Sequence, residues 1–317
     1  MGSFQGIEMG QNTANNKIVL EDETLRDGFQ VENRIFSLEE KLKLFYQLET
    51  AGLQRIQVGS FVNPKRVPQM ADTELLVKSI QKQGAKALLT ALVLNDKGLE
   101  RATQCGLKHV SMSISISDTH SKTNAGKTHL EALEKMSELI DQANKDDLTV
   151  RAGLQCSFGC VYEDKIEFLK VLKTAEAFAK SGASEINLAD TSGMANPVSI
   201  DSLVKLIQKE LPELSLSLHL HDTRGLGLVN MFAGYLAGVR TFDTCVGGLG
   251  GCPFVRGAAG NVSTEDAVHM FSAMGIEINI DLSLLCDVVA NLEGILGRKL
   301  PGRMKTVISA ENNYVFQ

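Results

Sequence analysis

The chain has 317 residues, of which 44% are hydrophobic and 22% are charged, and it contains 28 glycines and 6 prolines. This composition allows a large buried core and excludes extensive disorder. A net charge of −6 without a long run of Lys or Arg speaks against a nucleic-acid partner, and no apolar stretch approaches the roughly 18 residues of a membrane span.

The six cysteines are dispersed through a chain that shows no secretory leader. We therefore expect reduced thiols and a cytoplasmic location. Residues 1–16 are expected to form a flexible leader. Because the net charge is negative, an anionic substrate would have to be met by local positive groups or by a metal ion.

From residue 17 onward, strand-like segments alternate with segments that have the pattern of helices. The first strand is expected at 17–22 and the first helix at 37–51, because Ser37 and Glu40 form a capping-box pair and Gly52 stands where a helix ends. Seven further strands are expected at 55–61, 85–94, 109–117, 149–158, 185–190, 215–222 and 241–246. The helices that follow them are expected at 71–83, 97–105, 130–144, 164–180, 200–210, 226–236 and 264–274.

Eight alternating units predict parallel strands joined by crossover helices. The fold class is therefore α/β, a (β/α)8 TIM barrel over residues 17–280, since such a barrel takes roughly 250 residues. A C-terminal helical extension, residues 281–317, is expected to pack on the barrel with a helix at 282–296. A doubly wound open sheet is the alternative, but the Gly-x-Gly-x-x-Gly turn of a Rossmann domain does not follow the first strand.

Polar residues alternate with leucines in the seventh strand, and alternate side chains of a strand share one face. Because the leucines suit packing against helices, the polar side chains are expected to face the barrel interior. They are Ser215, Ser217, His219 and His221. The two imidazoles would lie roughly 7 Å apart at their Cα atoms, which lets both reach one cation. A pair of hydrogen-bonded structural histidines is the alternative.

The first strand ends in an acidic segment that continues into Arg26, Asp27 and Gly28. Asp27 offers a hard oxygen ligand, and the planar donors of Arg26 can hold negative charge. A surface loop with an exposed ion pair is the alternative. At the end of the sixth strand, Asp190 is expected at the same barrel face, where it is either a site acid or part of a helix-entry turn.

A glycine-rich loop, residues 247–254, follows the eighth strand and carries Cys252 at its centre. Glycines in such a loop provide flexibility or allow the backbone to approach a ligand. A cysteine in this place is a candidate nucleophile or acid/base group. A long, tolerant surface loop is the alternative.

Together these motifs resemble the metal-dependent Claisen-type lyases and synthases typified by 3-hydroxy-3-methylglutaryl-CoA lyase. The resemblance extends over residues 19–274. It lies in the segments TLRDGFQ (24–30), GSFVNPK (59–65), VPQM (67–70), HLHDT (219–223), GLGGCPF (248–254), GN (260–261) and TED (264–266). The cysteine loop is the specific part, because isopropylmalate and citramalate synthases share the barrel and the metal pattern but resemble this chain less in the loop.

The resemblance implies roles for individual residues. The metal, Mg²⁺ or Mn²⁺, would be held by Asp27, His219, His221 and Asn261. The catalytic residues would be Arg26, which stabilises an enolate, Cys252, which takes part in proton transfer, and the two acids Asp190 and Glu265. Contacts with the substrate are expected from Gln30, Gln57, Ser60, Asn124 and Thr191, with His120 as a further candidate.

The leading expectation is cleavage of 3-hydroxy-3-methylglutaryl-CoA to acetyl-CoA and acetoacetate by a homo-oligomer, dimer or tetramer, whose partner is the acyl-CoA thioester. The family usually has Ile-Glu-Val on the second strand, whereas this chain has Gln57 in the middle position. A lyase for a larger 3-hydroxy-3-alkylglutaryl-CoA therefore stays open. So do an enzyme that condenses acetyl-CoA with a 2-oxo acid and a metal-binding barrel with weakened catalysis.

Overall fold

The computed structural model of the protein describes residues 17–163, 165–252 and 255–314. Eight parallel strands stand side by side in chain order, and the eighth pairs with the first to close the barrel. The strands are β1 Val19–Asp22, β2 Arg55–Ser60, β3 Leu88–Leu92, β4 His109–Ser115, β5 Thr149–Gln155, β6 Glu185–Ala189, β7 Ser215–His219 and β8 Thr241–Thr244. The predicted TIM barrel is confirmed.

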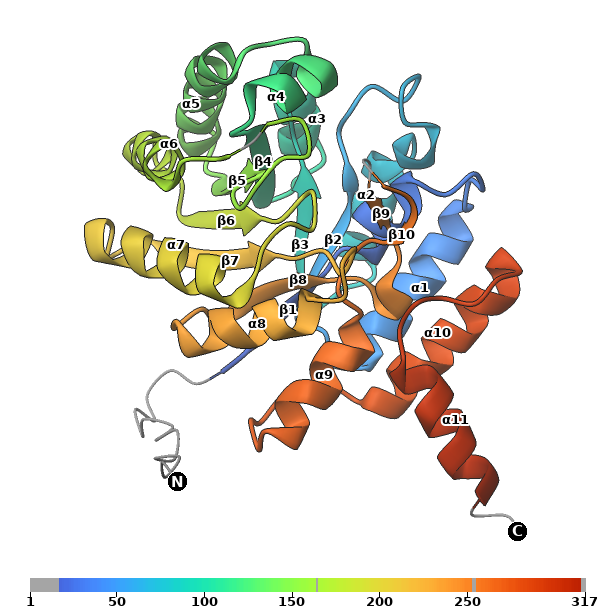
Figure 1. The fold of residues 1–317 in the computed structure, drawn as a ribbon. Coiled ribbons are helices and arrows are strands. Elements are labelled where there is room, and N and C mark those ends of the chain that lie inside the picture. The colour runs from blue at the N-terminus through green and yellow to red at the C-terminus, as the bar shows by residue number, and fades with distance from the viewer. Residues whose placement is uncertain (1–16, 164, 253–254, 315–317) are drawn as a thin grey trace, which may run out of the picture.

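Helices surround the strands on the outside (Figure 1). They are α1 Leu38–Thr50, α2 Thr73–Lys82, α3 Asp96–Gln104, α5 His129–Lys145, α6 Phe168–Lys180, α7 Pro197–Glu210, α8 Gly227–Leu236 and α9 Thr264–Ala273. The capping box at the start of α1 is confirmed: the Ser37 hydroxyl accepts from the Glu40 N–H, and the Glu40 carboxylate accepts from the Ser37 N–H at 2.8 Å. None of the helices in the described residues is long and apolar enough to cross a membrane.

Several short elements were not predicted, because they are too short or too polar to carry a periodic apolar pattern. They are the π-helix η1 Thr24–Gly28, the 3-10 helices η2 Pro68–Met70 and η3 Val246–Gly248, helix α4 Asp118–Ala125, and the hairpin β9 Gly251–Cys252 with β10 Val255–Ala259. All of them lie between the carboxyl end of a strand and the barrel helix that follows it. Their positions are therefore set by tertiary contacts around the barrel mouth.

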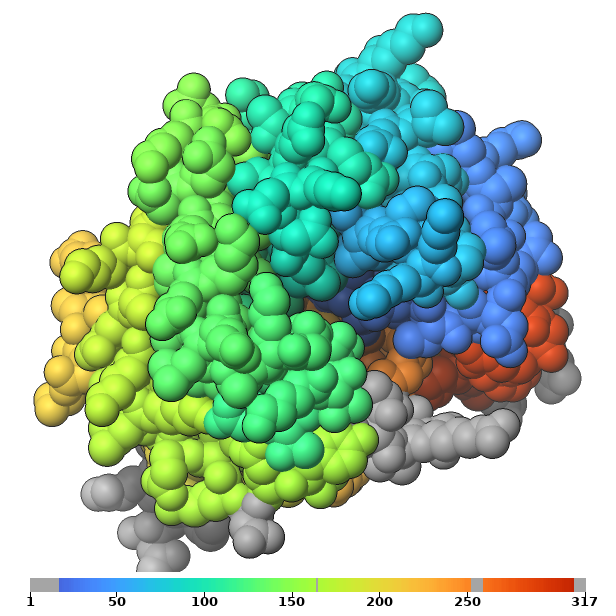
Figure 2. Space-filling view, turned by 90° about the horizontal axis from the view of Figure 1, so that it is seen from above, coloured from blue at the N-terminus to red at the C-terminus, as the bar shows by residue number. Residues whose placement is uncertain are grey.

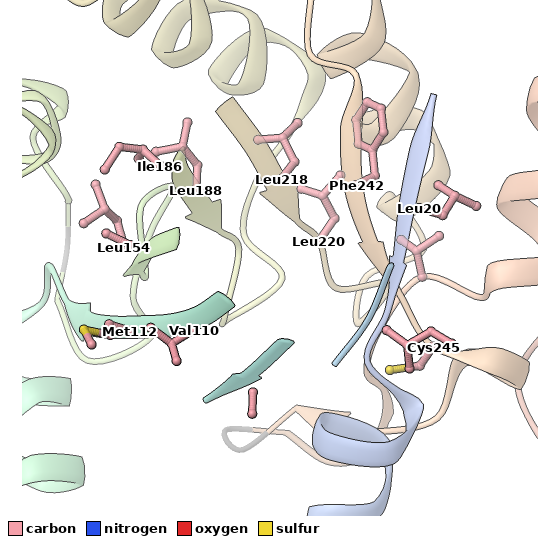
Figure 3. Close-up of a cluster of buried hydrophobic side chains, with 14 of the residues drawn as sticks. Leu20, Val110, Met112, Leu154, Ile186, Leu188, Leu218, Leu220, Phe242 and Cys245 are labelled. Carbon is pink, nitrogen blue, oxygen red and sulfur yellow. The ribbon is translucent and has the colours of Figure 1, made fainter. Parts of the chain in front are cut away.

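The apolar core fills the space between the strands and the helices (Figure 3). The side chains of Leu218 on β7 and Phe242 on β8 point toward α8 and pack against Gly234. A Cβ atom on Gly234 would collide with the Leu218 side chain, so this helix approaches the barrel closely because position 234 has no side chain.

Charged side chains occupy the inside of the barrel. The Arg151 guanidinium lies 2.6 Å from Asp243 Oδ1, 2.8 Å from Glu23 Oε1 and 3.0 Å from Glu21 Oε2, and all four residues are buried. Arg55 pairs with Glu21 and, at 2.8 Å, with Glu185. The polar interior was predicted from the alternating serines and histidines, but its arginines and carboxylates were not.

The C-terminal helices α10 Leu282–Leu296 and α11 Met304–Tyr314 form the predicted extension beside α1 and α9 (Figure 1). The Asp266 carboxylate on α9 accepts hydrogen bonds from the backbone N–H groups of Arg303 and Met304 at 2.8–3.0 Å. These contacts fix the start of α11 against the barrel. The predicted leader, residues 1–16, lies outside the described residues.

Replacing Arg151 by Met should lower the free energy of unfolding by about 3–5 kcal/mol, because the buried carboxylates around it lose their cation. Urea denaturation followed by circular dichroism measures this loss. The matched control is Arg34→Met, since Arg34 pairs with Glu40 at the surface and its removal should cost less than about 1 kcal/mol. Equal losses in the two variants would contradict the importance of the buried network.

Candidate active site

A cavity of about 450 Å³ opens at the carboxyl ends of the strands, the face where TIM-barrel enzymes carry their chemistry. In Figure 2 the blue β1–α2 segment and the green α4–α5 segment lie on either side of a recess. The charged and imidazole side chains that line the cavity are Glu23, Arg26, Asp27, His120, Arg151, His219, His221 and Asp243. This concentration of charge marks it as the candidate active site.

The π-helix η1 brings Arg26 and Asp27 into the cavity. The Glu23 carbonyl accepts hydrogen bonds from the N–H groups of Arg26, Asp27 and Gly28 at 3.0, 2.7 and 3.2 Å, which tightens the chain directly after β1. The Thr24 hydroxyl accepts from the Val246 N–H at 2.8 Å and so ties this turn to the end of β8. Such π-turns occur frequently at functional sites.

Three predicted metal ligands converge at the floor of the cavity. One ligand atom each of Asp27, His219 and His221 lies within 4.8 Å of the others, and all three residues are buried. The two histidine Nε2 atoms are 3.1 Å apart. Neighbouring ligands at about 2.1 Å from an octahedral cation are separated by about 3 Å, so the histidine pair has the spacing of two ligands of one ion.

Asn261 completes this group. An isolated backbone bridge pairs it with His221, and its Nδ2 donates to Asp27 Oδ2 at 2.8 Å and to the Leu249 carbonyl at 3.0 Å. Its Oδ1 is buried and has no hydrogen-bond partner among the described residues. An unsatisfied buried oxygen on a residue that contacts Asp27 and pairs with His221 fits a further ligand of a divalent cation, so the predicted four-ligand set is compatible with Mg²⁺ or Mn²⁺.

Two carboxylates orient His219 from behind. Its Nδ1 lies 3.2 Å from Asp243 Oδ2 and 3.4 Å from Glu23 Oε2, so Nδ1 carries the proton and Nε2 faces His221. Burial acts to lower the pKa of His219, but the contacts with Asp243 and Glu23 outweigh it and raise the pKa to about 10. Burial and the neighbouring His219 lower the pKa of His221. This is the carboxylate–histidine arrangement that supports metal ligands.

Charged groups of both signs lie close together around the site. Three guanidinium groups, those of Arg26, Arg55 and Arg151, face five carboxyl groups, those of Glu21, Glu23, Asp27, Glu185 and Asp243. Burial raises the pKa of Glu21 in this surrounding, although Arg151 and Arg55 act to lower it. Counted with a protonated His219, four cationic groups face these five carboxyl groups, and a bound dication would take the place of that proton.

Asp190 lies beside the cavity but is not one of its lining residues. Its Oδ1 accepts from the N–H groups of Met194 and Ala195 at 2.7 and 3.0 Å, and burial raises its pKa to about 7. These bonds hold the turn that places Thr191 on the cavity wall. The predicted catalytic role of Asp190 stays a prediction, and its visible contacts support the turn.

Glu265 is fully buried behind η3, at the start of α9, and also does not line the cavity. Its Oε2 accepts from the Gly247 N–H at 2.9 Å, and burial raises its pKa to about 7. The Gly247 carbonyl in turn accepts from the Gly302 N–H at 3.0 Å. Glu265 therefore holds the loop after β8, and its predicted catalytic role stays a prediction.

Of the predicted substrate contacts, Gln30, Gln57, Asn124 and Thr191 line the cavity, as does His120. Ser60 does not: it is buried, and its hydroxyl donates to the Leu92 carbonyl at 3.3 Å. The pairing of β2 with β3 shifts register between Gln57 and Ser60, so the inward alternation of Gln57 does not extend to Ser60.

Arg151 and Asp243 were not predicted as site residues, and Glu23 was predicted only as part of the acidic end of the first strand. Each occupies a position of a barrel strand or strand end whose side chain faces inward, where TIM barrels commonly carry branched apolar residues. A charged residue at such a position is the signal that would have found them. Their mutual pairing required the register between strands that are distant in sequence.

The side chain of Cys252 lies outside the described residues, so the structure adds nothing to its predicted role. The strand β9 ends at Cys252, and Gly251, directly before it, lines the cavity. Gly250 packs against the ligand group with a φ of +101°, and a Cβ atom there would collide with Asn261. The loop therefore approaches the site through backbone that only glycine allows.

A TIM barrel with a carboxylate, two histidines and an asparagine converging at its mouth has the groups that a metal-dependent barrel enzyme requires. The family model described as HMGL-like matches residues 17–292. The chain is 37% identical to (R)-citramalyl-CoA lyase of Chloroflexus aurantiacus, over 90% of this chain and 92% of that protein. It is 36% identical to the hydroxymethylglutaryl-CoA lyase of Bacillus subtilis, over 90% of this chain and 96% of that protein.

Among solved structures, an HMG-CoA lyase from Acinetobacter baumannii in complex with coenzyme A and 3-methylmalate is similar, with a TM-score of 0.86 and 36% sequence identity. The match covers 92% of this chain and 95% of that chain. The chain belongs to the HMGL-like family and is a carbon–carbon lyase of CoA thioesters. The resemblance found in the sequence is thereby confirmed.

Replacing His221 by Ala should weaken Mn²⁺ binding by at least about 100-fold, because even residues that only support metal ligands contribute 10–100-fold. Isothermal titration calorimetry with Mn²⁺ measures the affinity. His109→Ala is the control, since His109 begins β4 at the opposite end of the barrel and should leave the affinity unchanged. Mn²⁺ binding that survives His221→Ala would show that the ion lies elsewhere.

Proposed function

We propose that the protein cleaves 3-hydroxy-3-methylglutaryl-CoA to acetyl-CoA and acetoacetate with the help of Mg²⁺ or Mn²⁺. The observation that carries this proposal is the convergence of Asp27, His219 and His221 with the unsatisfied oxygen of Asn261, directly beside Arg26. Such a site can bind oxygen atoms of a hydroxyacyl thioester and hold the negative charge that develops when its carbon–carbon bond breaks.

The reaction is a retro-Claisen cleavage. The C3 hydroxyl gives its proton to a basic group of the site, the O–H electron pair forms the ketone of acetoacetate, and the C2–C3 bond pair moves into the thioester enolate. A bound dication favours the alkoxide by polarising the substrate oxygens. The guanidinium of Arg26, held by Glu23, Asp27 and Gln57, supplies donors to the enolate oxygen. Protonation of the enolate carbon yields acetyl-CoA.

Cys252 is the proposed proton donor to that carbon. Support comes from the family resemblance of its loop and from Gly251, which lines the cavity directly before it. The loop would also shield the site from water when it closes over the substrate.

The residues that line the cavity suit an acyl group that is branched and polar. Apolar side chains that suit the 3-alkyl group are contributed by Val62, Val67, Leu92, Leu94 and Met112. Amide and hydroxyl groups that suit a carboxylate and a thioester are contributed by Asn124, Gln155 and Thr191. A second candidate substrate is (R)-citramalyl-CoA, favoured by the 37% identity to a citramalyl-CoA lyase.

Incubation with a panel of thioesters tests the proposal. The panel contains 3-hydroxy-3-methylglutaryl-CoA, (R)-citramalyl-CoA and larger 3-hydroxy-3-alkylglutaryl-CoAs, each with Mn²⁺ or with EDTA. Mass spectrometry should detect acetoacetate and acetyl-CoA from the first substrate, and EDTA should abolish both. Preferential turnover of another thioester would reassign the substrate, and release of free CoA from acetyl-CoA and a 2-oxo acid would reveal a condensing enzyme.

Replacing Cys252 by Ala should lower kcat by about 10²–10⁴-fold, the usual contribution of a positioned acid or base, while Mn²⁺ affinity stays unchanged. Steady-state kinetics and calorimetry measure the two quantities. The control is Cys286→Ala, which removes a buried thiol from α10 outside the cavity lining. A kcat for Cys252→Ala close to that of the control would remove Cys252 from the mechanism.

The expected cytoplasmic location and homo-oligomeric assembly stay predictions.

A further inference from the structure

The side-chain amide of Gln57 has partners at both ends. Its Oε1 accepts from Arg26 Nε. Its Nε2 is 2.8 Å from Glu23 Oε1, 3.2 Å from Glu21 Oε1 and 3.2 Å from Ser111 Oγ. The amide orientation is therefore determined by its surroundings: the nitrogen faces two carboxylates, and the oxygen faces a guanidinium.

A glutamate at position 57 would not fit this arrangement. It would place a third carboxylate within about 3 Å of the Glu21 and Glu23 carboxylates inside a buried site, where like charges repel strongly. The departure from the usual family residue is therefore explained by the carboxylates on β1 and does not indicate decay of the site.

We propose that Glu23, at the end of β1, supplies the carboxylate that positions both Arg26 and His219. This inference rests on the proposed function, since it assigns roles within the same site. Glu23 lines the floor of the cavity, and its side chain is almost completely buried.

The contacts of Glu23 connect the two halves of the site. Its Oε2 accepts from Arg26 Nη2 and lies 3.4 Å from His219 Nδ1. Its Oε1 accepts from Gln57 Nε2 and Arg151 Nη2, both at 2.8 Å. One carboxylate thus fixes the plane of the Arg26 guanidinium and, together with Asp243, the direction of the His219 ring. Glu23 is a positioning residue, because it acts through these two side chains.

Glu21 provides a matched comparison. It is buried on the same face of the same segment, two residues earlier, and it also contacts Gln57 and Arg151. It does not line the cavity, and no contact of Glu21 with Arg26 or His219 is found in the described chain. A variant at either position therefore loses a buried carboxylate. Only a variant at Glu23 also loses the contacts that position Arg26 and His219.

The experiment compares Glu23→Gln, Glu21→Gln, Gln57→Glu and the exchange Glu23→Gln/Gln57→Glu. Two quantities are measured for each: kcat on 3-hydroxy-3-methylglutaryl-CoA with Mn²⁺, and Mn²⁺ affinity by calorimetry. Glu23→Gln should lower both about 10–100-fold, the range known for residues that orient metal ligands. Glu21→Gln should destabilise the fold but leave both within about threefold of the wild type, a difference too small for a residue of that class.

The two remaining variants test the transfer of the carboxylate between strands. Gln57→Glu should lower kcat, because the added charge opposes Glu21 and Glu23. The exchange should recover about tenfold or more of the kcat lost in Glu23→Gln, since it keeps one carboxylate and one amide in contact with Arg26. If Glu23→Gln does not fold, the proposal is tested by comparing the kcat of Gln57→Glu and of the exchange variant with that of the wild type.

The proposal is overturned if Glu23→Gln keeps the kcat and Mn²⁺ affinity of the wild type, if Glu21→Gln loses as much, or if Gln57→Glu gains activity. Failure of the proposed function has a different signature: the wild-type protein would not turn over the substrate. In that case the difference in Mn²⁺ affinity between Glu23→Gln and Glu21→Gln still decides whether Glu23 positions His219.

Discussion

The guanidinium of Arg151 connects the middle of the barrel to its mouth. It holds Glu21 and Glu23 of the β1 segment and Asp243 of β8 from a single position on β5. Two of these carboxylates face His219, and one of them faces Arg26. A buried cation with incomplete partners is costly, so the protein can keep Arg151 only while the whole set is assembled. Stability and site geometry therefore depend on the same contacts.

The barrel could be predicted from the sequence, because eight strand–helix units with capped helices can be recognised without knowing how the strands pair. It also predicted that Asp27, His219 and His221 would meet, since all three stand at carboxyl ends of strands. Glu23 and Arg151 could not be placed, because their roles depend on the stagger of strands about 130 residues apart, as in the Arg151–Glu23 contact. The backbone support given by Asp190 and Glu265 was equally invisible, since an acid near a motif looks the same whether it faces the cavity or the chain.

The structure changes the meaning of Gln57. Considered alone, an amide in place of an acid suggests a weakened enzyme. In the folded chain the oxygen of this amide accepts from a guanidinium and its nitrogen lies beside two carboxylates, so its two ends match those neighbours. An amide on β2 is thus compatible with a complete site, because the neighbouring β1 segment supplies the carboxylates.

The loop after β8 is held from both ends of the chain. Thr24 accepts from the Val246 N–H, and the Gly302 N–H donates to the Gly247 carbonyl. During synthesis the first of these partners is available early, but the second leaves the ribosome only after the entire barrel has been made. A nascent chain that already contains every predicted metal ligand therefore still lacks one of the contacts that hold the loop after β8.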